Sequence, residues 1–344
     1  MPKFRTHLVI SKHDAERITP LKFEHVKLEF VAEPSNCYWE STDGKSSSIS
    51  YGGRDPKTIG KDEIPLSELI IETETQEIAD DFISVIQSGI LLAFPEASII
   101  DSFVFAIEYS KSNDWVYQGE TFFSHLKKFD DVVFGCLVTN RVLGNNQLVY
   151  ALEKYKTSLH LTSFNPLSAN PKYKQVFNNY SFKREYHTKA AFAIITAFSV
   201  IEELGLEIRS SQKNPRFIDN EKGEWNPDVL QNLTNRLEQN SLKADMTFDW
   251  IYRGNPTRIE QNIKPYFGYD SEWTKYGEDV RDKTLTLPEA IHNASYLRNY
   301  IAAHKFNELT QYISPYDVFN VQSLSRILII RTLGLWDEMT NRHI

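Results

Sequence analysis

The sequence predicts an α+β protein in which a mixed, strand-rich N-terminal domain is followed by an all-α helix bundle. Over residues 1–118, short segments rich in β-branched and aromatic residues alternate with clusters of turn-forming residues. From residue 119 onward, apolar residues recur at helical spacing. A chain of 344 residues is also long enough for two domains, each with its own core. We therefore predict two domains, 1–118 and 119–344.

The first domain is expected to be a twisted sheet interrupted by one helix. The helix is predicted over 75–92, where Ile78, Phe82, Ile86 and Ile90 lie on one face. Turn-forming residues such as those at 41–44 separate the strands. The predicted strands are residues 6–10, 28–32, 46–51, 69–74 and 102–109.

The second domain is expected to contain five or six helices joined mostly by short turns, which is the organisation of a helix bundle. Gly205 is suited to end one helix and Pro288 to begin another. Residues 252–282 are polar and contain Gly and Pro, so they are predicted to form a long loop. The predicted helices are residues 132–142, 147–159, 186–206, 227–242, 288–306 and 316–333.

Composition and charge restrict the function classes. The formal net charge is −8, which argues against a general nucleic-acid binder. Residues 1–170 contain 16 Lys and Arg against 24 Asp and Glu, whereas residues 171–344 contain 22 of each. The neutral second half is therefore compatible with a local RNA-binding cleft, and the acidic first half with a regulatory domain.

The same features predict a cytoplasmic protein. No apolar stretch approaches the roughly 18 residues that indicate a membrane helix, so no membrane partner is expected. The N-terminal residues lack the apolar segment of a secretory signal. Cys37 and Cys136 are far apart and are expected to be reduced thiols.

A short motif near the C-terminus carries the main chemical signal. Arg298 and Asn299 are followed after four residues by His304, within one predicted helix. Histidine exchanges protons near neutral pH, and the guanidinium of arginine is a permanently charged fork that matches phosphate. These residue types are suited to cutting RNA.

Regular helical geometry places the two motif side chains in different directions. His304 follows Leu297 by seven residues and lies on the apolar stripe, while Arg298 points about 100° away from Leu297. His304 and Arg298 are then separated by about 120°. One straight helix would not aim both at one phosphate, so the spacing favours either a composite site across a dimer axis or no site.

The motif RNYIAAH, residues 298–304, resembles the one that ribonucleases of the HEPN superfamily carry late in a small helical bundle. Residues 187–207, HTKAAFAIITAFSVIEELGLE, are similar to an early bundle helix of HEPN proteins in bacterial phage-defence systems. The resemblance implies a homodimer in which two motifs form one metal-independent site. It further implies that His304 is a general base or acid, that Arg298 stabilises the phosphorane and that Asn299 positions the phosphate or braces the motif. The products would carry 2′,3′-cyclic phosphate and 5′-hydroxyl ends.

Supporting residues follow from the predicted helix over 186–206. Glu202 continues its apolar row, so it is a candidate semi-buried carboxylate that would orient Arg298. The alternative is that this helix end is solvated and carries no function. His187 and His292 belong to no motif and are expected to be surface or capping residues. No spacing of His, Cys or carboxylates indicates a metal site, and no cofactor is expected.

These observations predict a metal-independent endoribonuclease, a regulated toxin or phage-defence effector. Its partners would be RNA, such as tRNA or mRNA, a second copy of the chain, and an unidentified trigger for the N-terminal domain. The main alternative is a non-catalytic HEPN-like adaptor or nucleotide-sensing module, in which an intramolecular carboxylate holds Arg298 and His304 is buried. A further alternative is a structural homodimer of helices without a ligand.

Overall fold

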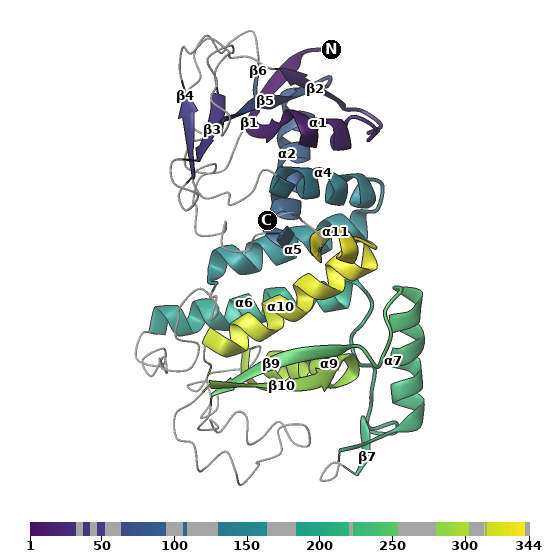
Figure 1. The fold of residues 1–344 in the computed structure, drawn as a ribbon. Coiled ribbons are helices and arrows are strands. Elements are labelled where there is room, and N and C mark those ends of the chain that lie inside the picture. Colours follow the sequence, from purple (N-terminus) through teal and green to yellow (C-terminus); the bar gives the residue numbers. More distant parts are fainter. Residues whose placement is uncertain are drawn as a thin grey trace. The chain divides into compact units, whose positions relative to one another are not determined.

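The computed structural model divides the chain into two compact units, residues 1–149 with 337–344, and residues 150–336. Its described part is mixed, with many helices and small antiparallel sheets, in agreement with the predicted α+β class (Figure 1). The predicted boundary at 118/119 lies outside the described residues and stays a prediction. The structure describes residues 1–31, 37–41, 47–51, 63–93, 106–108, 130–163, 184–219, 223–253, 280–302, 313 and 315–340.

Unit 1 is built on an antiparallel sheet with strand order β4-β3-β5-β1-β6 and with β2 also paired to β5. The ten-residue β5 organises it, because β1 pairs along one edge while β2 and β3 divide the other between them. The prediction did not include β3. The strands are β1 (Lys3–Ser11), β2 (Lys27–Val31), β3 (Cys37–Ser41), β4 (Ser47–Tyr51), β5 (Glu63–Glu72) and β6 (Ile107–Glu108).

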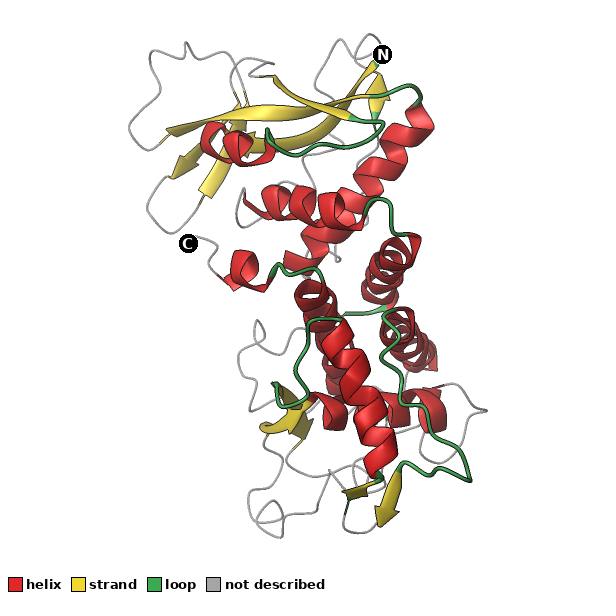
Figure 2. Ribbon diagram, turned by 90° about the vertical axis from the view of Figure 1, so that its right-hand side faces the viewer, coloured by secondary structure: helices red, strands yellow, loops and turns green. Residues whose placement is uncertain are grey.

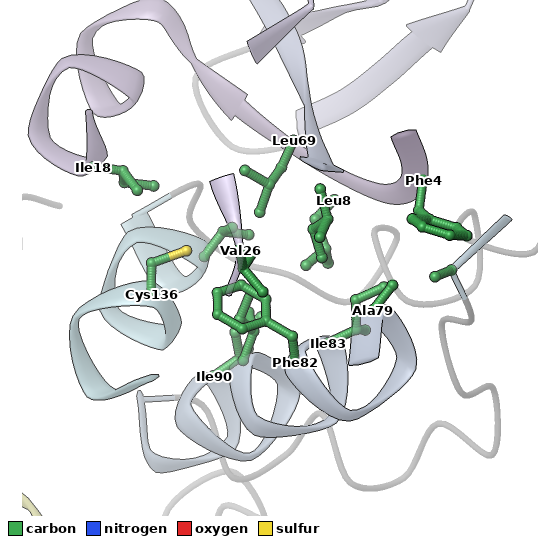
Figure 3. Packing of buried hydrophobic residues seen from close by; sticks show 14 of the residues in the cluster. Phe4, Leu8, Ile18, Val26, Leu69, Ala79, Phe82, Ile83, Ile90 and Cys136 are labelled. Carbon is green, nitrogen blue, oxygen red and sulfur yellow. The ribbon is translucent and has the colours of Figure 1, made fainter. Parts of the chain in front are cut away.

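Helices of unit 1 pack against one face of this sheet. Phe4 and Leu8 of β1 and Leu69 of β5 meet the apolar side of α2, including Phe82 and Ile83 (Figure 3). The helical spacing seen at residues 75–92 therefore forms the predicted helix and buries its stripe in the core. The packed helices are α1 (Lys12–Ile18), α2 (Gln76–Ala93) and α4 (Asp130–Val142). Unit 1 also contains α11 (Trp336–Thr340) from residue 337 onward, and the sequence did not predict α1 and α11.

The helices α2 and α4 approach each other through two glycines. A Cβ added to Gly89 would lie 2.9 Å from the Cα of Gly135, and a Cβ added to Gly135 would lie 2.7 Å from the carbonyl oxygen of Ile86. Contacts this short would force atoms to move, so the packing of the two helices leaves no room for a side chain at either glycine.

Unit 2 contains helices together with two pairs of strands, so the prediction of an all-α C-terminal part is wrong. The antiparallel pairs are β7–β8 and β9–β10. The helices are α5 (Asn146–Leu161, from residue 150 in this unit), α6 (Arg184–Glu203), α7 (Pro227–Gln239), α9 (Leu287–Tyr296), the π-helical segment η6 (Leu297–Ala302) and α10 (Pro315–Thr332). The strands are β7 (Phe217–Asp219), β8 (Glu224–Trp225), β9 (Thr247–Arg253) and β10 (Val280–Thr286).

The strands β9 and β10 form because a short period-two pattern interrupts the helical one. Phe248 and Trp250 are buried, and Asp249 between them is exposed. On the exposed side, the hydroxyl of Thr284 in β10 donates to the carboxylate of Asp249 over 2.8 Å. The predicted loop over 252–282 therefore has strand residues at both ends, and its residues 254–279 lie outside the described part.

Helix α10 packs along α6 in unit 2 (Figure 1), and Figure 2 shows the helices and strands of this unit by colour. Three buried polar side chains attach α10 to other elements. Asn320 exchanges two hydrogen bonds of 2.9 Å with the backbone of Ile251 in β9. Gln322 donates to the carbonyl of Ser158 in α5, and Ser325 donates to the carbonyl of Ala197 in α6. Each of these hydrogen bonds gives a buried polar side chain a partner and ties α10 to a neighbouring element.

Candidate functional site

The segment carrying the motif is formed by two kinds of helix in succession. The carboxylate of Glu289 accepts a hydrogen bond of 2.7 Å from the backbone N–H of Thr286, and Pro288 occupies the first turn, so α9 begins where β10 ends. At Leu297 the backbone changes to a π-helical turn that runs to Ala302. The single regular helix predicted over 288–306 is therefore wrong in this part.

The π-helical turn changes the geometry of the motif. Its hydrogen bonds connect residues five apart, and such turns are frequent at functional sites. The separation of about 120° between Arg298 and His304, which assumes 3.6 residues per turn, therefore does not apply. His304 itself, with residues 303–312, lies outside the described part of the chain. Its predicted burial and direction stay predictions.

The guanidinium of Arg298 lies at the contact between η6 and α6. Its Nη2 is 3.5 Å from Oε1 of Glu202, and its carbon Cζ is 6.0 Å from the ring centroid of Phe198. Its Nη1 donates to Oδ1 of Asn299 over 2.8 Å. The side chain is 35% exposed, so a carboxylate, an aromatic ring and an amide orient a cation that still reaches solvent.

Glu202 was a candidate partner of Arg298, with a solvated helix end as the alternative, and the structure shows both an ion pair and an exposed side chain. Its side chain is 39% exposed, whereas that of Glu203, which pairs with Lys154 of α5, is 27% exposed. The expectation of a semi-buried Glu202 is therefore wrong. The physical reason is that the fully buried face of α6 runs through Ala193, Ala197 and Ile201, and the row that ends at Glu202 lies at the edge of this face.

Helix α7 holds the end of α6 that carries Glu202. Gly205 has a φ of 69° and reverses the chain there, with its N–H donating to the carbonyl of Glu202. The guanidinium of Arg236 donates to the carbonyl of Gly205, and the amide of Asn240 donates to the carbonyl of Leu204. These contacts give two terminal carbonyl groups partners and fix the position of Glu202.

Asn299 connects Arg298 to a buried serine. Its Nδ2 donates to Oγ of Ser295 over 3.2 Å while its Oδ1 accepts from Arg298. A guanidinium only donates hydrogen bonds, so the oxygen of the amide must face Arg298 and the nitrogen must face Ser295. The orientation of the Asn299 amide is therefore defined at both ends.

A second arginine, Arg216, also donates a hydrogen bond to Ser295, and this contact was not predicted from the sequence. Nη2 of Arg216 donates to Oγ of Ser295 over 3.2 Å, and Nη1 of Arg216 lies 2.6 Å from Nδ1 of His292. The connected groups Glu202, Arg298, Asn299, Ser295, Arg216 and His292 are called the polar network below. They bring together side chains from α6, α9, η6 and the segment that precedes β7.

His292 is buried at 4% exposure, and His187 is also buried, so the expectation that both are surface or capping residues is wrong. The rings of Phe217 and Trp225 contact the imidazole of His292 edge-on, with centroids 5.0 and 6.2 Å away. Burial, with the Arg216 guanidinium as the second cause, lowers the pKa of His292 to about 3. Because Arg216 only donates, Nδ1 accepts and the neutral ring carries its proton on Nε2.

A spacing signal for part of the polar network is present in the sequence. His292, Ser295 and Asn299 follow one another at intervals of three and four residues, which places them on one helical face. Polar residues that recur at helical spacing indicate a polar face on this helix. No spacing pattern predicts that Arg216, which is 76 residues from His292 in the sequence, contacts this histidine.

Other kinds of site find no support in the described residues. No group of three or more His, Cys, Asp or Glu side chains there is arranged to hold a metal ion. In the same residues, no helix has both the length and the apolar character needed to cross a membrane. Cys136 is buried in the core of unit 1, which raises the pKa of its thiol to about 12.

Comparisons with known proteins find no matching family model, no matching curated protein and no matching solved structure. The function of the chain is therefore inferred from its own residues, above all from the polar network around Arg298.

Proposed function

We propose that the protein is a metal-independent endoribonuclease of the HEPN type that uses Arg298, Asn299 and His304. The observation that supports this proposal best is the environment of Arg298. Its guanidinium is oriented by Glu202 and Asn299 while its side chain remains 35% exposed. An oriented and accessible guanidinium is suited to bind the charge that grows on a phosphate during cleavage.

The proposed chemistry divides the roles as follows. His304 removes the proton of a ribose 2′-hydroxyl as a general base, or protonates the leaving 5′-oxygen as a general acid. The oxygen of the 2′-hydroxyl forms a bond to phosphorus as the bond to the 5′-oxygen breaks, which leaves a 2′,3′-cyclic phosphate and a 5′-hydroxyl. Arg298 stabilises the phosphorane, and Asn299 keeps the guanidinium in its orientation.

The pair between Glu202 and Arg298 is compatible with this role. Both side chains are more than a third exposed, and ion pairs in such positions contribute only about 0–1 kcal/mol. A phosphate, which carries its own negative charge and several acceptor oxygens, would displace the carboxylate at little cost. Glu202 would then hold Arg298 ready in the absence of RNA.

The second candidate is a non-catalytic adaptor or nucleotide-sensing module. It is favoured by the same ion pair, because a carboxylate within the chain neutralises the cation that catalysis would need. In this case Glu202 is a permanent partner of Arg298, and the polar network only stabilises unit 2.

The decisive experiment is a cleavage assay on the full chain with a fluorescent RNA. Arg298→Ala and His304→Ala should each abolish cleavage, activity should persist in EDTA, and a 2′-deoxyribose at the cut should block it. Arg209→Ala is the matched control, because Arg209 is an exposed arginine that pairs with Glu207 in the same unit. Full activity of a folded Arg298→Ala protein, freed of contaminating nuclease, would leave only the second candidate.

Substitution of Glu202 by glutamine separates the two candidates further. In a ribonuclease, the variant should bind RNA more tightly, because the carboxylate no longer competes with phosphate for Arg298. In an adaptor that binds no RNA, the affinity for RNA should stay at background in both proteins. Fluorescence anisotropy at two salt concentrations measures this difference.

The proposal includes a homodimer, since ribonucleases of this type form one site from two motifs. Light scattering on the full chain at micromolar concentration should give twice the mass of 39.9 kDa. A single species of monomer mass that still cuts RNA would remove the composite site but leave the roles of the individual residues.

A further inference from the structure

We propose that Ser295 and Arg216 are positioning residues that set the orientation of Asn299 and, through it, of Arg298. This inference deepens the proposed ribonuclease function and rests on it for its catalytic meaning. Neither residue belongs to the motif at 298–304, and Ser295, which is only 3% exposed, is not expected to touch RNA.

The hydrogen bonds of the polar network converge on the hydroxyl oxygen of Ser295. Arg216 and Asn299 both donate to the hydroxyl oxygen of Ser295, each over 3.2 Å. Arg298 donates to the amide oxygen of Asn299 over 2.8 Å. Ser295 is therefore the acceptor that keeps the amide nitrogen of Asn299 turned inward and its oxygen turned toward Arg298.

Arg216 is held in place from the opposite side. Nη1 of Arg216 lies 2.6 Å from Nδ1 of His292, and the rings of Phe217 and Trp225 pack against that imidazole. His292 stays neutral in these surroundings, so it accepts from Arg216 rather than repelling it. The rigid part of unit 2 thus extends to Ser295, and Asn299 connects it to the exposed guanidinium.

The π-helical turn explains why Arg298 needs this connection. Arg298 and Asn299 lie in η6, whose backbone departs from the regular geometry of α9, whereas Ser295 and His292 lie in α9. The bond between Ser295 and Asn299 crosses the change from one geometry to the other. Displacement of a reacting group by about 1 Å can cost a hundredfold in rate, so this bond is expected to matter for cleavage.

The test is a double-mutant cycle on the single-turnover cleavage rate of the full chain. Ser295→Ala should lower the rate about ten- to hundredfold while the Kd for RNA changes less than about threefold. The double variant Ser295→Ala with Asn299→Ala should cut as fast as Asn299→Ala alone, because Ser295 acts through Asn299. A double variant slowed by the product of the two single effects would overturn the proposal.

Ser325→Ala is the matched control, because Ser325 is an equally buried serine of the same unit whose hydroxyl only donates to the carbonyl of Ala197. It should lower the melting temperature without changing the cleavage rate of the folded protein. If Ser295→Ala does not fold, Arg216→Gln takes its place in the cycle, since Arg216 is only half-buried and reaches Ser295 from another element.

An NMR measurement distinguishes failure of this inference from failure of the proposed function. The side-chain amide protons of Asn299, assigned by their loss in Asn299→Ala, should be protected from exchange in the wild-type protein and lose that protection in Ser295→Ala. If the wild-type protein cuts no RNA, the ribonuclease proposal fails but this measurement still decides the positioning. Unchanged protection in Ser295→Ala would overturn the positioning whether or not RNA is cut.

Discussion

Two contacts between helices, one in each unit, are built on opposite principles. In unit 1, α2 and α4 meet through Gly89 and Gly135, where a Cβ added to either glycine would clash with the backbone of the other helix. In unit 2, α6 meets η6 through the exposed pair of Glu202 and Arg298. The first contact consists of close-packed backbone, and the second of charged groups that reach solvent.

This difference indicates that the glycine contact of unit 1 stabilises the fold, whereas the ion pair of unit 2 is available for a function. Close packing leaves no room for an added atom, so substitution of either glycine is expected to lower the stability of unit 1. A half-exposed ion pair contributes little to folding, because solvent screens it and ordering its side chains costs entropy. Several elements orient Arg298 although the stability of the fold does not require its ion pair. Such a group is a candidate for binding or catalysis.

The largest effect on stability is expected from Gly135→Ala. The added methyl group would lie 2.7 Å from the carbonyl oxygen of Ile86 and 2.8 Å from Cγ1 of Ile90. Overpacking of this kind costs about 1–3 kcal/mol, from which the better helix propensity of alanine recovers at most about 1 kcal/mol. Hydrogen exchange of the α2 amides, which reports unit 1 directly, should show the loss.

Asp81→Ala, at an exposed position of α2, is the control and should change stability by less than about 0.5 kcal/mol. If Gly135→Ala were as stable as the control, the two helices would have separated without loss, and the contrast with the polar contact would disappear.

A second effect, which appears only as the pH is lowered, is expected from His292. Its pKa is about 3 in the folded protein and close to its ordinary value near 6.5 when unfolded, so the unfolded chain binds more protons between these values. Stability is therefore fully present above about pH 6.5 and falls as the pH is lowered, with a slope of up to about 1.4 kcal/mol per pH unit from this group. His292→Gln should flatten that slope between about pH 6 and pH 4, measured by urea unfolding at several pH values.

A slope that is the same in His292→Gln would mean that the imidazole is solvated and can be protonated in the folded protein. The neutral acceptor assigned to Arg216 would then be incorrect, and so would this end of the polar network.

The smallest effect on stability is expected from Glu202→Gln. The pair with Arg298 is exposed, so its loss should lower the free energy of unfolding by less than about 1 kcal/mol. Thermal unfolding with Thr157→Ala as a control, an exposed position of α5, measures it. A loss of several kcal/mol would place this ion pair among the structural contacts and would favour the adaptor over the ribonuclease.

Long periodic segments were predictable because their signal is summed over many residues. The helices found as α2, α5, α6 and α10 agree with their predictions to within a few residues, since each repeats its apolar positions over four or more turns. The predicted end of the helix near Gly205 also agrees, because only glycine readily adopts the positive φ found there.

Shorter periodic segments were not predictable in the same way. The strand β9 has seven residues, of which only Phe248 and Trp250 mark the buried face by a period of two. Within a region of helical spacing, so short an alternation does not stand out, and the C-terminal part was predicted to be all-α. The hairpin is stabilised by contacts distant in sequence, such as those between Asn320 and the backbone of Ile251.

In the candidate site, too, some features were predictable from the sequence and others were not. The sequence alone determined that Arg298, Asn299 and His304 share one segment, because this relation depends on local spacing. It offered Glu202 only as one candidate partner of Arg298. Tertiary structure decided the rest. The burial of His292, the approach of Arg216 and the departure from regular helix at Leu297 arise where elements far apart in the sequence pack together, and local periodicity carries no information about which distant side chain completes a contact.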